Sequence, residues 1–506
     1  MIKEWLFSRA LFPLTELAAG SRFWSRYHQV LNGLSLHERQ RLQSQQTRLA
    51  NLLKLAGEQV DIWLETFDAV GIDANTTHAG NADAMLDRLS IAQKSTFANG
   101  FPDRVTVKQN ADRWQCLSSA GTTGRMTVVT DFAKRDYLRA AEHVNLKAAL
   151  DKAVGCTTLD IPSPACNVVC GFADEGPESL MAYLFWCIRR NRLFDAASLS
   201  DIRGRVERQV LLNRKTLLPI EPGHWQTVAV QLDAYLDQII NQKKQVIRGL
   251  PHFLLWLAAR AEQRQLQFPH VKFLIPYGGL AAEALTSRIS RAFSARFINF
   301  YGTGEIGAIG GTFEHNSDAL DIYQELVYLE IINDRNKRVA DGEVGRIVVT
   351  DLTNKAMPII RYDIGDIGYL EHDADSCRSR LKLLGRKQEC FIAESGRLIT
   401  TRDLQNLFFD YPPVVNFKLV RIANARYKLA LVCVNTEQHD LSKDILPLDK
   451  ISLDKLTEAF KRLLCADPQQ SGVEEESIQL KVKQVPFITP ETSGKYVAFK
   501  DFASID

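Results

Sequence analysis

The order of predicted elements between residues 272 and 300 constrains the fold more than any other feature. The run "KFLIP" at 272–276 predicts a strand, and "RFINF" at 296–300 predicts another. The segment between them has one apolar helix face, made by Leu285, Ile289 and Phe293. A helix that connects two strands is typical of a βαβ unit, whose strands lie parallel. The chain is therefore predicted to contain a parallel sheet covered by helices.

The same alternation extends along much of the chain. The runs "NVVCGF" at 167–172, "LVYLEII" at 326–332 and "GRIVVT" at 345–350 predict further strands between helical patterns. Residues 36–72 are helix-rich, with a leucine stripe formed by Leu42, Leu49, Leu52, Leu53 and Leu55. These patterns predict a large α/β domain with mostly parallel sheets over residues 1–385, whose first part, to about residue 110, is helical.

The pattern changes after Gly385. Residues 414–435 predict a hairpin, residues 451–465 an amphipathic helix, and residues 477–485 one more strand. A segment of about 120 residues is long enough to fold by itself. We therefore expect a small α+β domain over residues 386–506.

Composition excludes several classes of function. The 506 residues include 62 Lys and Arg against 60 Asp and Glu, so no basic field favours a nucleic-acid partner. The nine cysteines are scattered and form no CxxC pair, which is typical of a reducing cytoplasm. Glu4, Arg9 and Glu16 interrupt the apolar N-terminus, which argues against stable membrane insertion. An amphipathic core-facing helix is expected there, with membrane contact as the alternative.

Three glycine-rich stretches predict a ligand site. "YGGL" at 277–280 and "YGTGEIG" at 301–307 follow predicted strands, and ligands of open α/β sheets bind beyond the carboxyl ends of strands. "SSAGTTGR" at 118–125 offers accessible backbone N–H groups and hydroxyls suited to phosphate, although a surface turn is the alternative.

The chain has no Walker A, G-x-S-x-G or H-E-x-x-H motif, so neither a hydrolase triad nor a zinc peptidase is supported.

Six motifs follow one another in a fixed order. They are "SSAGTTGRMTVV" at 118–129, "NFYGTGEIG" at 299–307, "GEVGRIVVTDL" at 342–352, "PIIRYDIGD" at 358–366, "LLGRKQE" at 383–389 and "TPETSGKY" at 489–496. The series resembles the adenylate-forming superfamily of acyl- and aryl-CoA ligases, adenylation domains and luciferases. Within it the chain is similar to the phenylacetate-CoA ligase and CapK-type branch, on the evidence of "IIRYDIGD", "LDRLSIAQKSTFANGF" at 86–101 and "GLPHFLLWLAARA" at 249–261. The similarity covers roughly residues 40–500.

The resemblance implies an enzyme that activates a carboxylic acid with ATP and Mg²⁺. The residues that it implies for binding ATP or AMP are Ser119, Gly121, Thr122, Thr123, Gly124, Arg125, Gly278, Gly279, Tyr301, Gly302, Thr303, Asp366, Arg386 and Lys495. The catalytic residues that it implies are Lys495, Glu305, Thr122 and Arg386, and Glu305 would hold Mg²⁺. Substrate walls are expected from Tyr277, Gly279, Phe300, Gly302, Thr303 and Gly304. Their small and aromatic side chains favour a planar or aryl acid over a long chain.

The residue types suit this chemistry. An aromatic face such as that of Tyr301 can stack on adenine, and the two oxygens of Asp366 can accept hydrogen bonds from two ribose hydroxyls. A carboxylate such as Glu305 is a hard ligand for Mg²⁺. Lys495 would bring positive charge to the reacting carboxylate and phosphate when the small domain closes. Each residue also has a structural alternative: a core aromatic for Tyr301, a turn residue for Asp366, a helix-terminal acid for Glu305, and a solvated or ion-paired surface cation for Lys495 and Arg386.

The acyl acceptor stays open at this point. CoA is expected, and a carrier protein, an amine or a polymer hydroxyl is the alternative. Departures from the family pattern at Ala120, Gly304 and Gln388 motivate a second alternative, a nucleotide-binding protein without catalysis. The resemblance also raises the question of zinc, because some members of this branch carry a Cys/His site after the YGxxE motif. The segment around His315 lacks cysteines, so we predict no zinc. We expect a cytoplasmic protein and leave assembly as a homodimer open.

Overall fold

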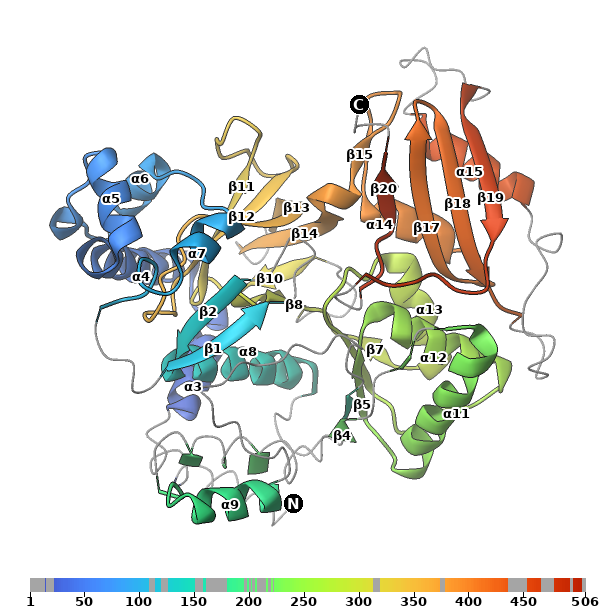
Figure 1. The fold of residues 1–506 in the computed structure, drawn as a ribbon, viewed down its shortest axis with the longest axis horizontal. Helices are drawn as coiled ribbons and strands as arrows, with labels where there is room; N and C mark the ends of the chain where they lie inside the picture. The colour runs from blue at the N-terminus through green and yellow to red at the C-terminus, as the bar shows by residue number, and fades with distance from the viewer. Residues whose placement is uncertain are drawn as a thin grey trace.

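The computed structural model describes most of the chain (Figure 1). The described residues are 14, 22–108, 114–119, 126–150, 158–160, 180–194, 198–199, 202, 205–206, 215–216, 220–221, 223–312, 319–373, 378–435, 453–465, 477–491 and 495–502. Five features predicted above lie outside these ranges: the N-terminal helix around Glu4, Arg9 and Glu16, the loop at 120–125, the strand at 167–172, His315, and residues 492–494. No helix among the described residues is both long enough and apolar enough to cross a membrane.

A five-stranded parallel sheet contains the predicted βαβ unit. Its strands, in spatial order, are β4 (Lys215–Thr216), β3 (Thr158–Asp160), β5 (Val246–Gly249), β6 (Phe273–Pro276) and β7 (Arg296–Phe297). The accompanying helices are α11 (Trp225–Asn241), α12 (Pro251–Gln263) and α13 (Glu283–Phe293). The order β6, α13, β7 confirms the prediction for residues 272–300. The predicted helix face is buried at Leu285, Ile289 and Phe293.

The largest sheet is antiparallel, so the expectation of mostly parallel sheets needs correction. Its seven strands, in spatial order, are β11 (Val327–Ile332), β12 (Gly345–Asp351), β13 (Tyr362–Asp373), β14 (Arg378–Arg386), β10 (Leu320–Ile322), β9 (Gly307–Gly311) and β8 (Phe300–Thr303). The reason lies in the connections. Residues 333–344 between β11 and β12 form a hairpin without a helix, and parallel strands need a longer crossover.

Residues 22–100 are mainly helical, which agrees with the leucine pattern at 36–72. The elements of the N-terminal region are α3 (Phe23–Ser35), α4 (Glu38–Gln59), α5 (Asp61–Ala69), η2 (Ala74–Thr76), α6 (Ala82–Arg88) and α7 (Lys94–Gly100), followed by the β1 (Trp114–Ser119) and β2 (Met126–Asp131) hairpin, α8 (Phe132–Leu150) and α9 (Leu180–Arg189). Leu49, Leu52 and Leu53 are buried in the core shared with the antiparallel sheet. Leu42 is 43% exposed, so the predicted leucine stripe begins later than expected.

The C-terminal part has a four-stranded mixed sheet. Its elements are η4 (Lys387–Glu389), β15 (Phe391–Ile392), β16 (Leu398–Ile399), α14 (Thr401–Phe409), β17 (Val414–Ala423), β18 (Arg426–Cys433), α15 (Leu453–Leu464), β19 (Gln479–Gln484) and β20 (Phe499–Asp501). β17 and β18 form the predicted hairpin, and β19 and β20 flank it in parallel. The predicted helix and final strand are α15 and β19, so these predictions are confirmed.

The C-terminal part packs on α12 and α13, as Figure 1 shows. Trp256 Nε1 of α12 donates a hydrogen bond to Val415 O of β17 at 3.1 Å. The start of α13 has no side-chain cap of its own. Two side chains of α14 accept from it instead: Ala282 N donates to Gln405 Oε1 at 2.9 Å, and Ala284 N donates to Asn406 Oδ1 at 3.0 Å. Helix α14 therefore caps a helix of the preceding region.

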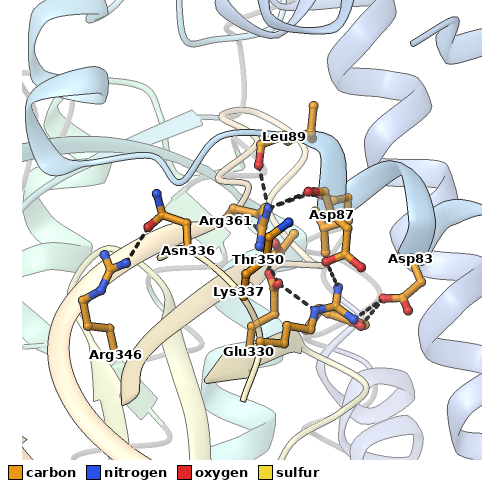
Figure 2. Close-up of polar contacts among 12 residues, drawn as sticks. Asp83, Asp87, Leu89, Glu330, Asn336, Lys337, Arg346, Thr350 and Arg361 are labelled. Carbon is orange, nitrogen blue, oxygen red and sulfur yellow. Dashed lines mark hydrogen bonds and ion pairs between the residues drawn. The ribbon is translucent and has the colours of Figure 1, made fainter. Parts of the chain in front are cut away.

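A buried arginine fixes the segment that leads into α7 (Figure 2). Arg361 is 3% exposed, pairs with Glu330 at 2.9 Å and donates to Leu89 O at 2.6 Å. Its carbonyl oxygen accepts a hydrogen bond from Ala92 N at 2.8 Å. Since α7 begins at Lys94, two residues later, this network places the first residue of α7 beside β13.

Candidate active site

One pocket of about 410 Å³ lies where the parallel sheet, the antiparallel sheet and the C-terminal part meet. The loops after β5 and β6 border it, together with β8, β13, β14 and residues 495–498. The predicted site residues that line it are Tyr277, Gly278, Gly279, Phe300, Tyr301, Gly302, Thr303, Gly304, Glu305, Asp366, Arg386 and Lys495. The expectation of a shared pocket beyond strand ends is confirmed.

The turn after β6 requires glycine at position 278. Gly278 has φ +73°, and a Cβ there would lie 2.9 Å from Leu250 Cδ2. It would also lie 3.8 Å from Lys495 Cε. A side chain at this position would be strained and would crowd Leu250 next to the lysine. The predicted glycine turn therefore lets the main chain pack closely against Leu250, beside Lys495.

Three residues form a polar cluster at one end of the pocket. Asp366 and Arg386 lie opposite each other on β13 and β14, and Arg386 Nε is 3.0 Å from Asp366 Oδ1. Tyr301 Oη donates to Asp366 Oδ2 at 2.6 Å. Burial raises the pKa of Asp366, while Arg386, Tyr301 and Lys495 oppose that rise. Each carboxylate oxygen can accept more than one hydrogen bond, so Asp366 keeps acceptor capacity for a ligand.

Glu305 lies in the turn between β8 and β9 and is 8% exposed. Lys94 Nζ pairs with its Oε1 at 3.1 Å. No group of three or more His, Cys, Asp or Glu side chains suited to a metal occurs among the described residues. A single carboxylate still suits Mg²⁺, which commonly takes one or two carboxylates together with phosphate oxygens and water. Glu305 therefore fits the expected ion as one ligand among several.

Lys495 lines the pocket from the C-terminal part. Burial lowers the pKa of its ammonium group, and Arg386 lowers it further, whereas Asp366, Glu305 and Glu389 raise it. The main chain closes on itself before this residue, because Glu491 N donates to Lys495 O at 2.9 Å. After it, Ala498 N donates to the buried Glu389 Oε2 at 3.0 Å. These two contacts hold the Lys495 segment against the pocket.

Several pocket residues were not predicted. Lys94 and Glu389 face the charged cluster, and His252 and Tyr496 line another wall. Lys94 and His252 lie inside the stretches 86–101 and 249–261 that carried the family resemblance. For His252, an imidazole in the first turn of a helix that follows a strand was the available signal, whereas Lys94 follows α6 and has no such signal. Glu389 and Tyr496 adjoin predicted site motifs but carry no such signal.

The phosphate-loop prediction concerns residues that the structure does not describe. Its residues Gly121, Thr122, Thr123, Gly124 and Arg125 stay predictions, as does the side chain of Ser119. The strands on both sides of this loop, β1 and β2, are described, and Ser119 pairs with Met126 in their backbone register. The strand that follows the loop, β2, contacts α7, the helix that begins at Lys94.

Comparison with known proteins gives related sequences and a related structure. No family model matches the chain. The phenylacetate-coenzyme A ligase of Thermus thermophilus is 23% identical over 382 residues, covering 73% of this chain and 76% of that protein. The phenylacetate-coenzyme A ligase of Escherichia coli is 25% identical over 376 residues, covering 71% and 73%. A crystal structure of 2-hydroxyisobutyryl-CoA ligase in the postadenylation state, in complex with R3-HIB-AMP, has a TM-score of 0.65 at 15% identity, covering 93% and 91%.

The fold is that of the adenylate-forming ligases, with a large N-terminal α/β part and a C-terminal part. Within that superfamily, the related sequences lie in the phenylacetate-CoA ligase-like branch. The resemblance predicted from the six motifs is confirmed.

Proposed function

We propose that this protein is an ATP-dependent, AMP-forming carboxylate ligase that makes an acyl adenylate and then a CoA thioester. The observation that carries the proposal is the meeting of Tyr301, Asp366, Arg386, Glu305 and Lys495 in one pocket. Residues far apart in sequence supply groups suited to a nucleotide and to a carboxylate. We propose residues 1–385 as the domain that binds ATP and acid, and residues 386–506 as a mobile lid.

The cluster around Asp366 suits the nucleoside. Asp366 would accept hydrogen bonds from the ribose hydroxyls, while Arg386 holds its carboxylate in place at 3.0 Å. Tyr301 would offer its ring face to adenine while its hydroxyl holds Asp366. The loop at 120–125 would cradle the phosphates. In this arrangement the triphosphate would extend toward Glu305 and Lys495.

The first half-reaction joins two anions. A carboxylate oxygen of the acid would form a bond to the α-phosphorus of ATP, and the bond from that phosphorus to the bridging oxygen would break, releasing pyrophosphate. The Lys495 ammonium group would reduce repulsion between the anions at the moment of transfer. Mg²⁺ held by Glu305 and the phosphates would supply further charge neutralisation.

The second half-reaction needs access for an acceptor. Rotation of the lid would withdraw Lys495 and let a thiol attack the acyl carbon, so that AMP leaves and a thioester forms. The matched relatives are phenylacetate-coenzyme A ligases, which favours CoA as the acceptor and an aryl acid as the substrate. The glycines and aromatic residues along the pocket also suit a planar acid. Transfer to a carrier protein, an amine or a hydroxyl, and a nucleotide-binding protein without catalysis, are the alternatives.

An assay of pyrophosphate with a panel of acids tests the proposal. We expect acid-dependent exchange of pyrophosphate into ATP with at least one aryl acid, and stoichiometric thioester and AMP when CoA is added. Exchange without a CoA-dependent product would favour another acceptor. Retained ATP binding with no exchange for any aryl, acyl or amino acid would contradict the proposed catalysis and favour the nucleotide-binding alternative.

The lowered pKa of Lys495 predicts an alkaline limit on adenylation. The protonated form is the one that neutralises charge, and it is lost as pH rises through a pKa that burial has moved below the usual lysine value. We therefore expect kcat/KM for exchange to fall with rising pH, since kcat/KM reports the free enzyme. In a Lys495→Arg variant that retains measurable exchange, the fall should move to higher pH. An identical alkaline limb in both proteins would argue against this assignment.

We propose a cytoplasmic location. Three of the described cysteines, Cys187, Cys390 and Cys433, form no disulfide. Thiols of this kind suit a reducing compartment. Assembly as a homodimer stays a prediction that light scattering can test.

A further inference from the structure

Three residues that line the pocket each carry a buried polar atom that has no role in the mechanism proposed above. The atoms are His252 Nε2, Tyr496 Oη and Asn416 Nδ2. Each is buried, and none has a hydrogen-bond partner among the residues that the structure describes. A buried polar group without a partner destabilises the folded state. Three such groups around one cavity indicate that a bound molecule supplies the partners.

Ring contacts hold these groups on one wall. The His252 and Tyr496 rings are edge to face, with centroids 4.3 Å apart. Both rings pack against Trp256, whose Nε1 donates to Val415 O, next to Asn416 in β17. The wall therefore combines α12, β17 and the segment that follows Lys495.

The place in the fold also favours a ligand. His252 is the second residue of α12, which begins directly after β5 of the parallel sheet. The carboxyl end of a parallel strand is where ligands bind in this fold class. The N-terminus of the 13-residue helix presents backbone N–H groups there, which favours an oxygen acceptor.

The chemistry of the wall is neutral and rich in donors. Asn416 Oδ1 already accepts from Phe417 N at 2.9 Å, which leaves its NH₂ group as a donor. Burial lowers the pKa of His252 to about 3, so the imidazole carries no charge at neutral pH. Tyr496 can donate its hydroxyl proton. An uncharged oxygen, as in a hydroxyl or a carbonyl group, complements this set.

The position of Tyr496 identifies which substrate is recognised. It follows Lys495 directly, so the wall is complete only while Lys495 occupies the pocket. On the proposed function, that is the state in which the acid reacts with ATP, whereas the thiol acceptor arrives after the lysine has left. This argument rests on the proposed function.

We propose that His252, Asn416 and Tyr496 form a subsite that selects carboxylic acids bearing a second, uncharged oxygen substituent. The subsite recognises the hydroxyl or carbonyl group while Lys495 acts on the reacting carboxylate. These three residues position and select the acid and do not take part in bond making.

Matched pairs of acids test the subsite. Pyrophosphate exchange is measured for phenylacetate against mandelate, phenylacetate against 4-hydroxyphenylacetate, and isobutyrate against 2-hydroxyisobutyrate. In at least one pair we expect the wild-type protein to use the hydroxylated acid with a kcat/KM about 10-fold higher, as a buried hydrogen bond allows. Tyr496→Phe and His252→Leu should lower that ratio about 5- to 10-fold.

A second tyrosine in the C-terminal part provides the control. Tyr411 lies outside the pocket lining, and Tyr411→Phe makes the same chemical change there. The ratio should be unchanged in this variant. A merely structural role of Tyr496 would lower exchange equally for both members of a pair, and that result overturns the subsite. Equal use of both members of every pair by the wild-type protein also overturns the subsite. The absence of exchange with any acid would instead overturn the proposed function itself.

Discussion

Replacing Lys495 by alanine is expected to reduce acid-dependent pyrophosphate exchange about 10³-fold while ATP still binds. The Lys495 side chain passes Gly278 at its Cε atom and shares the pocket with Asp366 and Arg386. Removing one well-placed charged donor from a site where charge develops costs about 10²- to 10³-fold in rate. Exchange kinetics give the rate, and equilibrium dialysis with ATP gives the affinity.

An exposed lysine of the same C-terminal part serves as the control. Lys483 lies on the solvent side of β19, and Lys483→Ala should leave both quantities within about twofold of wild type, as expected for a surface substitution. Normal exchange in Lys495→Ala would show that the pocket lysine has no part in adenylation. A parallel loss of ATP affinity and exchange would instead assign Lys495 to ground-state binding.

Replacing Asp366 by asparagine is expected to weaken ATP binding about 10- to 100-fold. The substitution keeps the size of the side chain but removes the charge that Arg386 and Tyr301 hold in place. A hydrogen bond to a charged group contributes about 1.5–3 kcal/mol, and the guanidinium group would lose its partner. Titration calorimetry measures the dissociation constant directly.

A nucleotide that lacks the ribose hydroxyls distinguishes two causes of weaker ATP binding. One is the loss of hydrogen bonds to the ribose, and the other is the loss of the charged partner of Arg386. The wild-type protein should bind 2′,3′-dideoxy-ATP more weakly than ATP, and Asp366→Asn should bind both about equally. Asp334→Asn is the matched control, because Asp334 is exposed and pairs with Lys387 at the surface. If the penalties for the missing hydroxyls and for Asp366→Asn simply add, Asp366 does not contact the ribose.

The sequence predicted those parts of the fold that depend on neighbouring residues. β6, α13 and β7 follow one another, and the β17–β18 hairpin closes over a short turn, so local periodicity was enough. The antiparallel sheet escaped prediction because its order depends on distant pairings. β10 lies between β14 and β9, and nothing in a three-residue strand specifies a partner about 60 residues later.

The same distinction applies to the site. Tyr301, Asp366, Arg386 and Lys495 stand in glycine-containing motifs, and all four line the pocket. Lys94 lies 211 residues from Glu305 along the chain, and only the fold brings the two side chains to 3.1 Å. Long-range electrostatic partners of this kind leave no periodic pattern in a single sequence.

The borrowed cap on α13 has a consequence for the lid motion that we propose. Gln405 and Asn406 satisfy main-chain amides of a helix to which they are not connected locally. If α14 moves away, water takes over those amides, and the loss of a cap costs about 0.5–2 kcal/mol. The cap therefore adds an energy of this size to the docked arrangement, alongside the apolar core that α12 and α13 share with the C-terminal part.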